Sequence, residues 1–237
     1  MNKNINFHKL SIDEQVKFAF SSEPDIGGRF IGMRKIQQGS VNKRTSLFSS
    51  KKNGGMISLE SNLELAYALE LERNINVKHY RTQALKIALN EFQSVYPDFL
   101  IKYNNENIEV HEVKPNKLYL KPDDIERYQQ VEHILDHLNI NFKIIDRLDL
   151  FINNEYELLT TLYFYHRNKT LSWPNFQIQE ALEVISKLNV QVLNEIYEGL
   201  EKNNLPRELG DYLIFYRYIP TPSFVGSRRS IKNMELL

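Results

Sequence analysis

Two runs of strand-forming residues flank a short polar turn in the middle of the chain, and this pattern constrains the fold most strongly. The runs are Phe99–Tyr103 and Ile108–Val113, and the turn between them is Asn104-Asn105-Glu106-Asn107. Two such runs around four polar residues predict an antiparallel hairpin. Pro115 ends the second strand, because proline has no N–H with which to extend a ladder of backbone hydrogen bonds.

Helical segments precede and follow this hairpin. From about Ser58 to Arg73 the chain is rich in helix-forming residues, and Pro122–Leu138 has an apolar stripe at helical spacing. Val77–Gln83 and Asn141–Ile145 have the composition of further strands. This succession of helices and strands predicts an α/β domain with a mixed sheet flanked by helices.

After about residue 152 the pattern becomes mainly helical. Helices are expected at Asn154–Arg167, Phe176–Leu188 and Val190–Leu200, followed by a strand-like aromatic run at Tyr212–Ile219. Three helices and a strand could form a small winged helix, and the tail from Pro220 is expected to be extended. We therefore predict a basic N-terminal arm at residues 1–56, an α/β domain at 57–152 and a mainly helical C-terminal domain at 153–237.

Composition limits the class of protein. The 237 residues are 42% hydrophobic and 25% charged, which is typical of a globular protein that buries a core. There is no cysteine, which excludes disulfides and zinc sites built on thiolates. Because we find neither the apolar run of a signal peptide nor a membrane span, we expect a soluble, cytoplasmic protein without a membrane partner.

Basic residues are concentrated near the N-terminus, although the formal net charge is zero. Residues 1–56 hold ten Lys or Arg and four Asp or Glu, whereas residues 57–150 hold eleven and sixteen. Such a segment is either a solvated leader or an arm that contacts phosphates. The candidate DNA-binding residues occupy a stretch without acidic residues: Arg29, Arg34, Lys35, Lys43, Arg44, Lys51 and Lys52.

The predicted hairpin brings two carboxylates and an ammonium group together. Asp98 stands where the first strand begins, and Glu112 and Lys114 project from one face of the second strand. The carboxylates and the backbone carbonyl of Val113 are hard oxygen donors that suit Mg²⁺, with Mn²⁺ as a substitute. Lys114 could stabilise charge on a phosphate, so the cluster indicates phosphodiester hydrolysis. The alternative is an exposed strand with an ordinary Glu–Lys pair.

A third carboxylate could come from the helix that precedes the hairpin. Glu60 and Glu64 are one helical turn apart, so either could face the cluster. Ser61 and Glu64 also match a capping box, in which the glutamate side chain accepts from the amide of the N-cap residue. The spacing therefore leaves Glu64 open as a metal ligand or as a helix cap.

Several blocks of the sequence resemble one family. Asn62–Val77 is similar to the Leu-Glu-Leu-Ala helix of the TnsA endonucleases, which are subunits of heteromeric transposases. Arg81-Thr82-Gln83, Asp98-Phe99-Leu100 and Val113-Lys114-Pro115 are similar to the family's succeeding blocks and follow in the same order. The resemblance covers about residues 57–120 and implies a restriction-endonuclease-like fold.

Carried over by position, the family's catalytic glutamate, aspartate and lysine fall on Glu64, Asp98 and Lys114. Glu112 occupies the position two before the lysine, which is glutamine in some relatives. The family usually has Gln-Pro where this chain has Gln83-Ala84. That departure leaves a functional role for Gln83 open.

The resemblance also implies a role and partners. TnsA-like proteins are Mg²⁺-dependent endonucleases that cut the 5′ strands at transposon ends during cut-and-paste transposition. A TnsB-like transposase cuts and joins the 3′ ends, and a TnsC-like ATPase couples cutting to target choice. Double-stranded DNA and these two proteins are therefore the expected partners. The alternatives are a stand-alone restriction-type or junction-resolving endonuclease, and a non-catalytic DNA-binding assembly subunit.

Overall fold

The structure is a computed structural model that describes residues 10–34, 45–150, 159–163, 173–188 and 192–222. The chain divides into two compact units, residues 1–152 and 153–237. No helix among the described residues is both long enough and apolar enough to cross a membrane.

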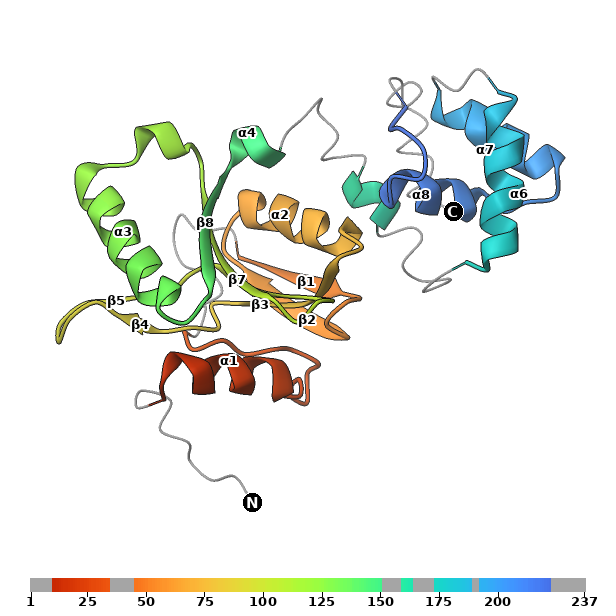
Figure 1. The fold of residues 1–237 in the computed structure, drawn as a ribbon. Helices are drawn as coiled ribbons and strands as arrows, with labels where there is room; N and C mark the ends of the chain where they lie inside the picture. Colours follow the sequence, from red (N-terminus) through yellow and green to blue (C-terminus); the bar gives the residue numbers. More distant parts are fainter. Residues whose placement is uncertain (1–9, 35–44, 151–158, 164–172, 189–191, 223–237) are drawn as a thin grey trace. The chain divides into compact units, whose positions relative to one another are not determined.

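Unit 1 is a mixed α/β unit with a four-stranded central sheet (Figure 1). Its elements in chain order are α1 (Ile12–Ser21), β1 (Ser46–Ser50), β2 (Gly55–Leu59), α2 (Asn62–Arg73), β3 (Val77–Thr82), β4 (Ile87–Ala88), β5 (Ser94–Val95), β6 (Phe99–Tyr103), β7 (Ile108–Lys114), the short 3-10 helix η2 (Lys117–Tyr119), α3 (Pro122–Asp136), β8 (Asn141–Asp146) and α4 (Arg147–Leu150).

The central sheet has the strand order β3-β6-β7-β8. Its first three strands are antiparallel neighbours, whereas β8 is parallel to β7. The chain passes from β7 to β8 through α3, because a parallel neighbour needs a long crossover connection. The predicted mixed sheet flanked by helices is therefore confirmed.

β6 and β7 form the antiparallel hairpin that the sequence predicts. Phe99 pairs with His111 and Lys102 pairs with Ile108, so the start of β6 lies beside the end of β7. The amide of Tyr103 donates to the carbonyl of Asn107 at 3.0 Å and closes the turn. Asp98 and Glu112 are consequently brought to one end of the sheet.

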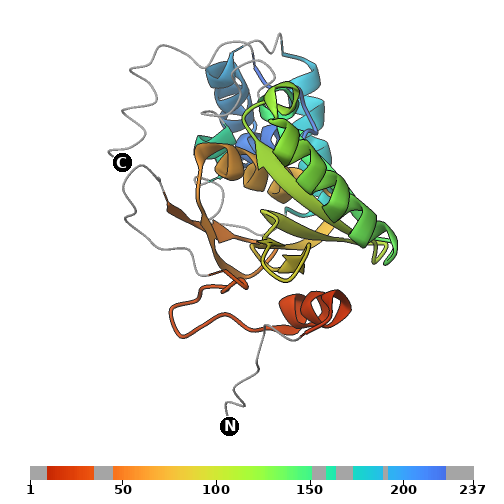
Figure 2. The same ribbon diagram turned by 90° about the vertical axis from the view of Figure 1, so that its left-hand side faces the viewer.

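The helices α2 and α3 cover opposite faces of the sheet. On β7, His111 contacts Tyr67 of α2, whereas its neighbour Glu112 contacts Tyr128 of α3. In Figure 1 the two helices lie on either side of β7 and β8, and in Figure 2 α3 lies in front of the sheet. The core of the α3 face joins residues from α1, the sheet and α3: Ala19, Leu100, Val110, Val131 and Leu135.

The N-terminal segment differs from the predicted arm. A capping box between Ser11 and Glu14 begins α1, and Ala19 of that helix is buried against the sheet core. β1 and β2 form an antiparallel hairpin that buries Phe48 and Ile57. The described residues up to 56 are therefore part of the folded unit, because their apolar side chains complete its core.

The predicted helix start at Ser58 is also wrong. Ser58 lies in β2, and α2 begins after Ser61, whose hydroxyl accepts from the amide of Glu64 at 3.1 Å. Glu60 therefore precedes the helix and is not one turn from Glu64 on its surface.

Unit 2 is mainly helical in its described part. It contains α6 (Asn175–Ser186), α7 (Leu193–Lys202) and α8 (Arg207–Phe215), and residues 159–163 are helical as well. The predicted strand at Tyr212–Ile219 is wrong, because α8 extends through Phe215. Every residue from Leu209 to Phe215 is buried, so this part of the helix has no exposed polar side that would reveal helical periodicity. The extended tail from Pro220 lies mostly outside the described residues.

Candidate active site

Two predicted site residues meet where β6 begins and β7 ends. The amide of Asp98 donates to Oε2 of Glu112 at 3.3 Å. The Asp98 carboxylate accepts through Oδ2 from the amide of Val113 at 2.8 Å. The prediction that the hairpin returns Asp98 toward Glu112 is confirmed, and the strand backbone holds Asp98 in place.

Lys114 and Glu112 form an ion pair on the α3 face of β7. Nζ of Lys114 lies 2.6 Å from Oε1 of Glu112, and the hydroxyl of Tyr128 donates to the same oxygen at 3.0 Å. Tyr128 lies on α3, where the sequence predicts only an apolar stripe. Its hydroxyl is therefore a contact that the sequence pattern did not reveal, because it depends on how α3 packs on the sheet.

Glu64 lies at the N-terminus of α2 and takes part in capping. Its Oε1 accepts from the hydroxyl of Ser61 at 3.0 Å, and its Oε2 accepts from the amide of Glu60 at 2.8 Å. The side chain thus reaches back one residue further than the capping box requires. Glu64 is buried, at 6% exposure, and Glu112 is among the charges that act on it.

The carboxylates repel one another in this buried setting. Burial raises the pKa of Asp98 to about 8, and the charges of Glu112 and Glu64 add to the rise. Burial also raises the pKa of Glu64, with smaller contributions from Glu60 and Glu112. Burial alone would lower the pKa of Lys114, but the carboxylates of Glu112 and Asp98 outweigh it and raise that pKa. Nearby positive charge, such as that of Lys114, favours the charged forms of these carboxylates, whereas burial favours their protonated forms.

The donor set suits a hard divalent cation by its chemistry. Glu64, Asp98 and Glu112 supply carboxylate oxygens, and the carbonyl of Val113 is a further donor of the same kind. Within the described residues, however, no three Asp, Glu or His side chains are already placed as a ligand set. Their oxygens instead accept from amides, hydroxyls and Lys114, so metal binding would require the side chains to exchange these partners.

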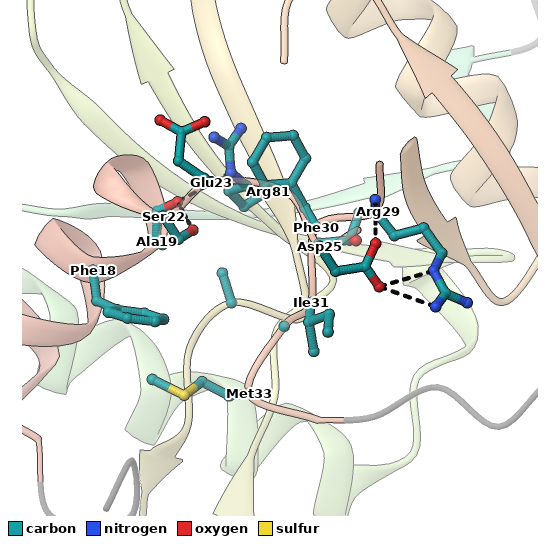
Figure 3. A pocket seen from close by; sticks show the side chains of 13 residues that line it. Phe18, Ala19, Ser22, Glu23, Asp25, Arg29, Phe30, Ile31, Met33 and Arg81 are labelled. Carbon is teal, nitrogen blue, oxygen red and sulfur yellow. Dashed lines mark hydrogen bonds and ion pairs between the residues drawn. The ribbon is translucent and has the colours of Figure 1, made fainter. Parts of the chain in front are cut away.

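The described candidate DNA-binding residues have partners within the chain. Arg29 pairs with Asp25 at 3.0 Å, as Figure 3 shows, and Arg34 pairs with Glu60. Nζ of Lys52 donates to the carbonyl of Asn74 at 2.8 Å, and Lys51 also has an interaction within the chain. The other three candidates, Lys35, Lys43 and Arg44, lie outside the described residues.

A cavity of about 330 Å³ lies between α1 and the segment that follows it (Figure 3). Phe18, Ile31 and Met33 line its interior, and the guanidinium group of Arg81 lies 3.8 Å from the centre of the Phe30 ring. None of the four predicted catalytic residues lines this cavity. The acidic cluster is therefore a separate feature of the unit.

Comparison with known proteins adds no family assignment. No protein-family model matches this chain, and no curated protein shows significant similarity to it.

Proposed function

We propose that this chain is a metal-dependent DNA endonuclease with a restriction-endonuclease-like core. The observation that supports this best is the arrangement of Asp98, Glu112 and Lys114 at one end of the β6–β7 hairpin. Glu64, near the N-terminus of α2, is one of the charges that raise the pKa of Asp98. A mixed sheet flanked by helices, with carboxylates at the ends of central strands, is consistent with such a nuclease.

The chain's own groups fit the needs of phosphodiester hydrolysis. Mg²⁺ bound by the carboxylates would lower the pKa of a water molecule and neutralise charge on the phosphate. Lys114 is 27% exposed, so its ammonium group can reach a ligand while it still pairs with Glu112. That positive charge would stabilise the negative charge that develops on the phosphate in the transition state.

The biological role follows from the resemblance to the TnsA endonucleases. We propose that the chain cuts the 5′ strands at transposon ends, together with a TnsB-like transposase and a TnsC-like ATPase. A net charge of zero suits a subunit that receives its DNA from a partner. Cutting by the isolated chain at a specific sequence would instead favour a stand-alone restriction-type or junction-resolving enzyme.

Divalent cations should control the activity. Mg²⁺ or Mn²⁺ should support cutting of duplexes that carry both element ends, whereas Ca²⁺ should bind without supporting it, because calcium activates water poorly. The measurement is strand-specific cleavage of end-labelled DNA in the presence of the partner transposase. Full cleavage in excess EDTA would contradict a metal-dependent mechanism.

The two possible roles of Glu64 can be separated by substitution. Glu64→Gln keeps an oxygen for the Glu60 amide and an amide group for Ser61, so the free energy of unfolding should change by less than about 0.5 kcal/mol. A neutral amide is a poor ligand for a hard cation, so cutting should fall by at least about 10²-fold. Glu70→Gln is the matched control, because Glu70 lies on the same helix and pairs with Arg73 near its C-terminal end, so its cutting should match that of the wild type. Undiminished cutting by Glu64→Gln would leave Glu64 as a helix cap only.

A further inference from the structure

Gln83 links the N-terminal segment to the acidic cluster. Its Nε2 donates to Oδ1 of Asp98 at 3.1 Å, and its Oε1 accepts from Nε of Arg34 at 3.0 Å. Arg34 also pairs with Glu60, whose amide holds Oε2 of Glu64. A continuous set of polar contacts therefore runs from Asp98 through Gln83 and Arg34 to the start of α2.

The backbone of Gln83 is held in a conformation that aims this side chain. Its φ of 51° lies in the left-handed region, which a non-glycine residue adopts only at a cost of about 1 kcal/mol. Two backbone hydrogen bonds maintain it: the amide donates to the Asp98 carbonyl at 3.0 Å, and the carbonyl accepts from the Met33 amide at 2.7 Å. Backbone strain of this kind is typical of residues that position a functional group.

Gly32 permits the close approach that makes these bonds possible. A Cβ atom at this position would lie 2.5 Å from the carbonyl oxygen of Gln83 and 2.6 Å from that of Thr82. Both neighbours are backbone atoms that cannot turn aside. Only glycine lets the Gly32–Arg34 segment pack directly against the end of β3, where it places Arg34 beside Gln83.

Asp98 is thereby held at both carboxylate oxygens. The Val113 amide fixes Oδ2, and the Gln83 side chain fixes Oδ1. Gln83 is 1% exposed, so water does not compete freely for its amide. Arg34 determines which end of that amide faces Asp98, because the guanidinium group can only donate and must face the amide oxygen.

We propose that Gln83 and Arg34 are positioning residues that aim the Asp98 carboxylate at the bound metal ion. This inference rests on the metal-dependent nuclease proposed above. In this proposal the main role of Arg34 is to bind Gln83 and Glu60 within the protein, and not to contact a DNA phosphate. Groups that orient metal ligands in this way typically change metal affinity by 10–100-fold when removed.

The test is Mn²⁺ binding to the full chain, measured by calorimetry without DNA. Gln83→Asn retains an amide and tolerates the left-handed backbone, but it is too short to reach both partners. Arg34→Lys retains the charge but loses the Nε donor. Each should weaken Mn²⁺ binding by about tenfold or more. Arg29→Lys is the matched control, because Arg29 pairs with Asp25 away from the cluster, and it should bind Mn²⁺ as the wild type does.

Salt dependence of duplex DNA binding separates the two roles of Arg34. A phosphate contact contributes about 0.9 to the slope of log affinity against log salt. The Arg34→Ala slope should equal the wild-type slope, while its Mn²⁺ affinity falls. A flatter slope with unchanged Mn²⁺ affinity would overturn the positioning role. If the variants and the wild type bind Mn²⁺ equally, the positioning role is wrong but the proposed nuclease is not affected. A wild type that binds no Mn²⁺ would overturn both.

Discussion

Asp98→Asn and Lys114→Ala should each reduce cutting by at least about 10²-fold and leave unit 1 folded. Asparagine has nearly the shape of aspartate, but it removes the negative charge that the proposed cation needs. Alanine at Lys114 removes the positive charge proposed to face the phosphate. Because both losses fall on the chemical step, kcat should fall more than the affinity for DNA.

Neither change should destabilise the fold strongly. The pKa of Asp98 is raised above its ordinary value, so its charged form is less stable in the folded protein than in the unfolded chain. The protonated Asp98 carboxyl group therefore stabilises the folded protein at low pH, and this stabilisation is lost as the pH rises through about 8. Asparagine is neutral, as the protonated carboxyl group is, so Asp98→Asn should retain the stability of the fold. Lys114 is partly exposed, and its alanine variant can admit water beside Glu112.

The measurements are single-turnover cleavage and urea unfolding of each variant. Lys143→Ala is the matched control for Lys114→Ala, because Lys143 also pairs with a glutamate, Glu109, on the adjacent strand and away from the cluster. Its cutting should match that of the wild type. If Asp98→Asn and Lys114→Ala cut as well as Lys143→Ala does, neither Asp98 nor Lys114 has a catalytic role. If either site variant loses more than about 3 kcal/mol in its free energy of unfolding, that residue has a structural role.

The central hairpin could be predicted because its determinants are local. Two runs of strand-forming residues, 99–103 and 108–113, flank a polar turn, and Pro115 marks the end of the ladder. In an antiparallel hairpin the start of the first strand lies beside the end of the second, so the approach of Asp98 to Glu112 follows from the predicted hairpin. Ser61 could likewise be predicted as the N-cap of α2, because a capping box is recognised from a serine and a glutamate three residues apart.

The contacts around the cluster could not be predicted in the same way. Gln83 reaches Arg34 across 49 positions of sequence, and Tyr128 reaches Glu112 only because α3 packs on that face of the sheet. Such contacts depend on tertiary packing, and a local pattern does not encode them. The unusual φ of Gln83 likewise follows from its two backbone partners, because glutamine has no intrinsic preference for that region.

The missed β1–β2 hairpin has a different cause. Its strands are rich in Ser and Gly and contain few β-branched residues, so the segment has the composition of a linker. Its stability comes from burial of Phe48, Ile57 and Leu59, which are all at most 1% exposed. Asn53 in its turn accepts from the amide of Tyr80 at 2.9 Å and from the Arg81 side chain at 2.8 Å.

Phe48→Ala should therefore destabilise unit 1 by about 3–5 kcal/mol, a large share of the roughly 5–15 kcal/mol typical of a folded protein. The phenyl ring is 1% exposed, and its loss leaves a cavity that the surrounding side chains cannot fill. Urea unfolding of the full chain measures the effect. Leu47→Ala is the matched control, because Leu47 is 41% exposed and should cost less than about 1 kcal/mol.

Removal of residues 1–56 should have a still larger effect, because it deletes α1, β1 and part of β2 together. It would remove the backbone carbonyl of Ala19 that accepts from Arg81 at 3.0 Å, and the side chain of Gln15 that bonds the Lys86 backbone. We expect the truncated chain to show no cooperative unfolding transition. Weaker DNA binding by this chain would therefore result from loss of the fold and not from loss of phosphate contacts. A truncated chain with the wild-type unfolding midpoint, or a cost below about 1 kcal/mol for Phe48→Ala, would show that the segment is a leader after all.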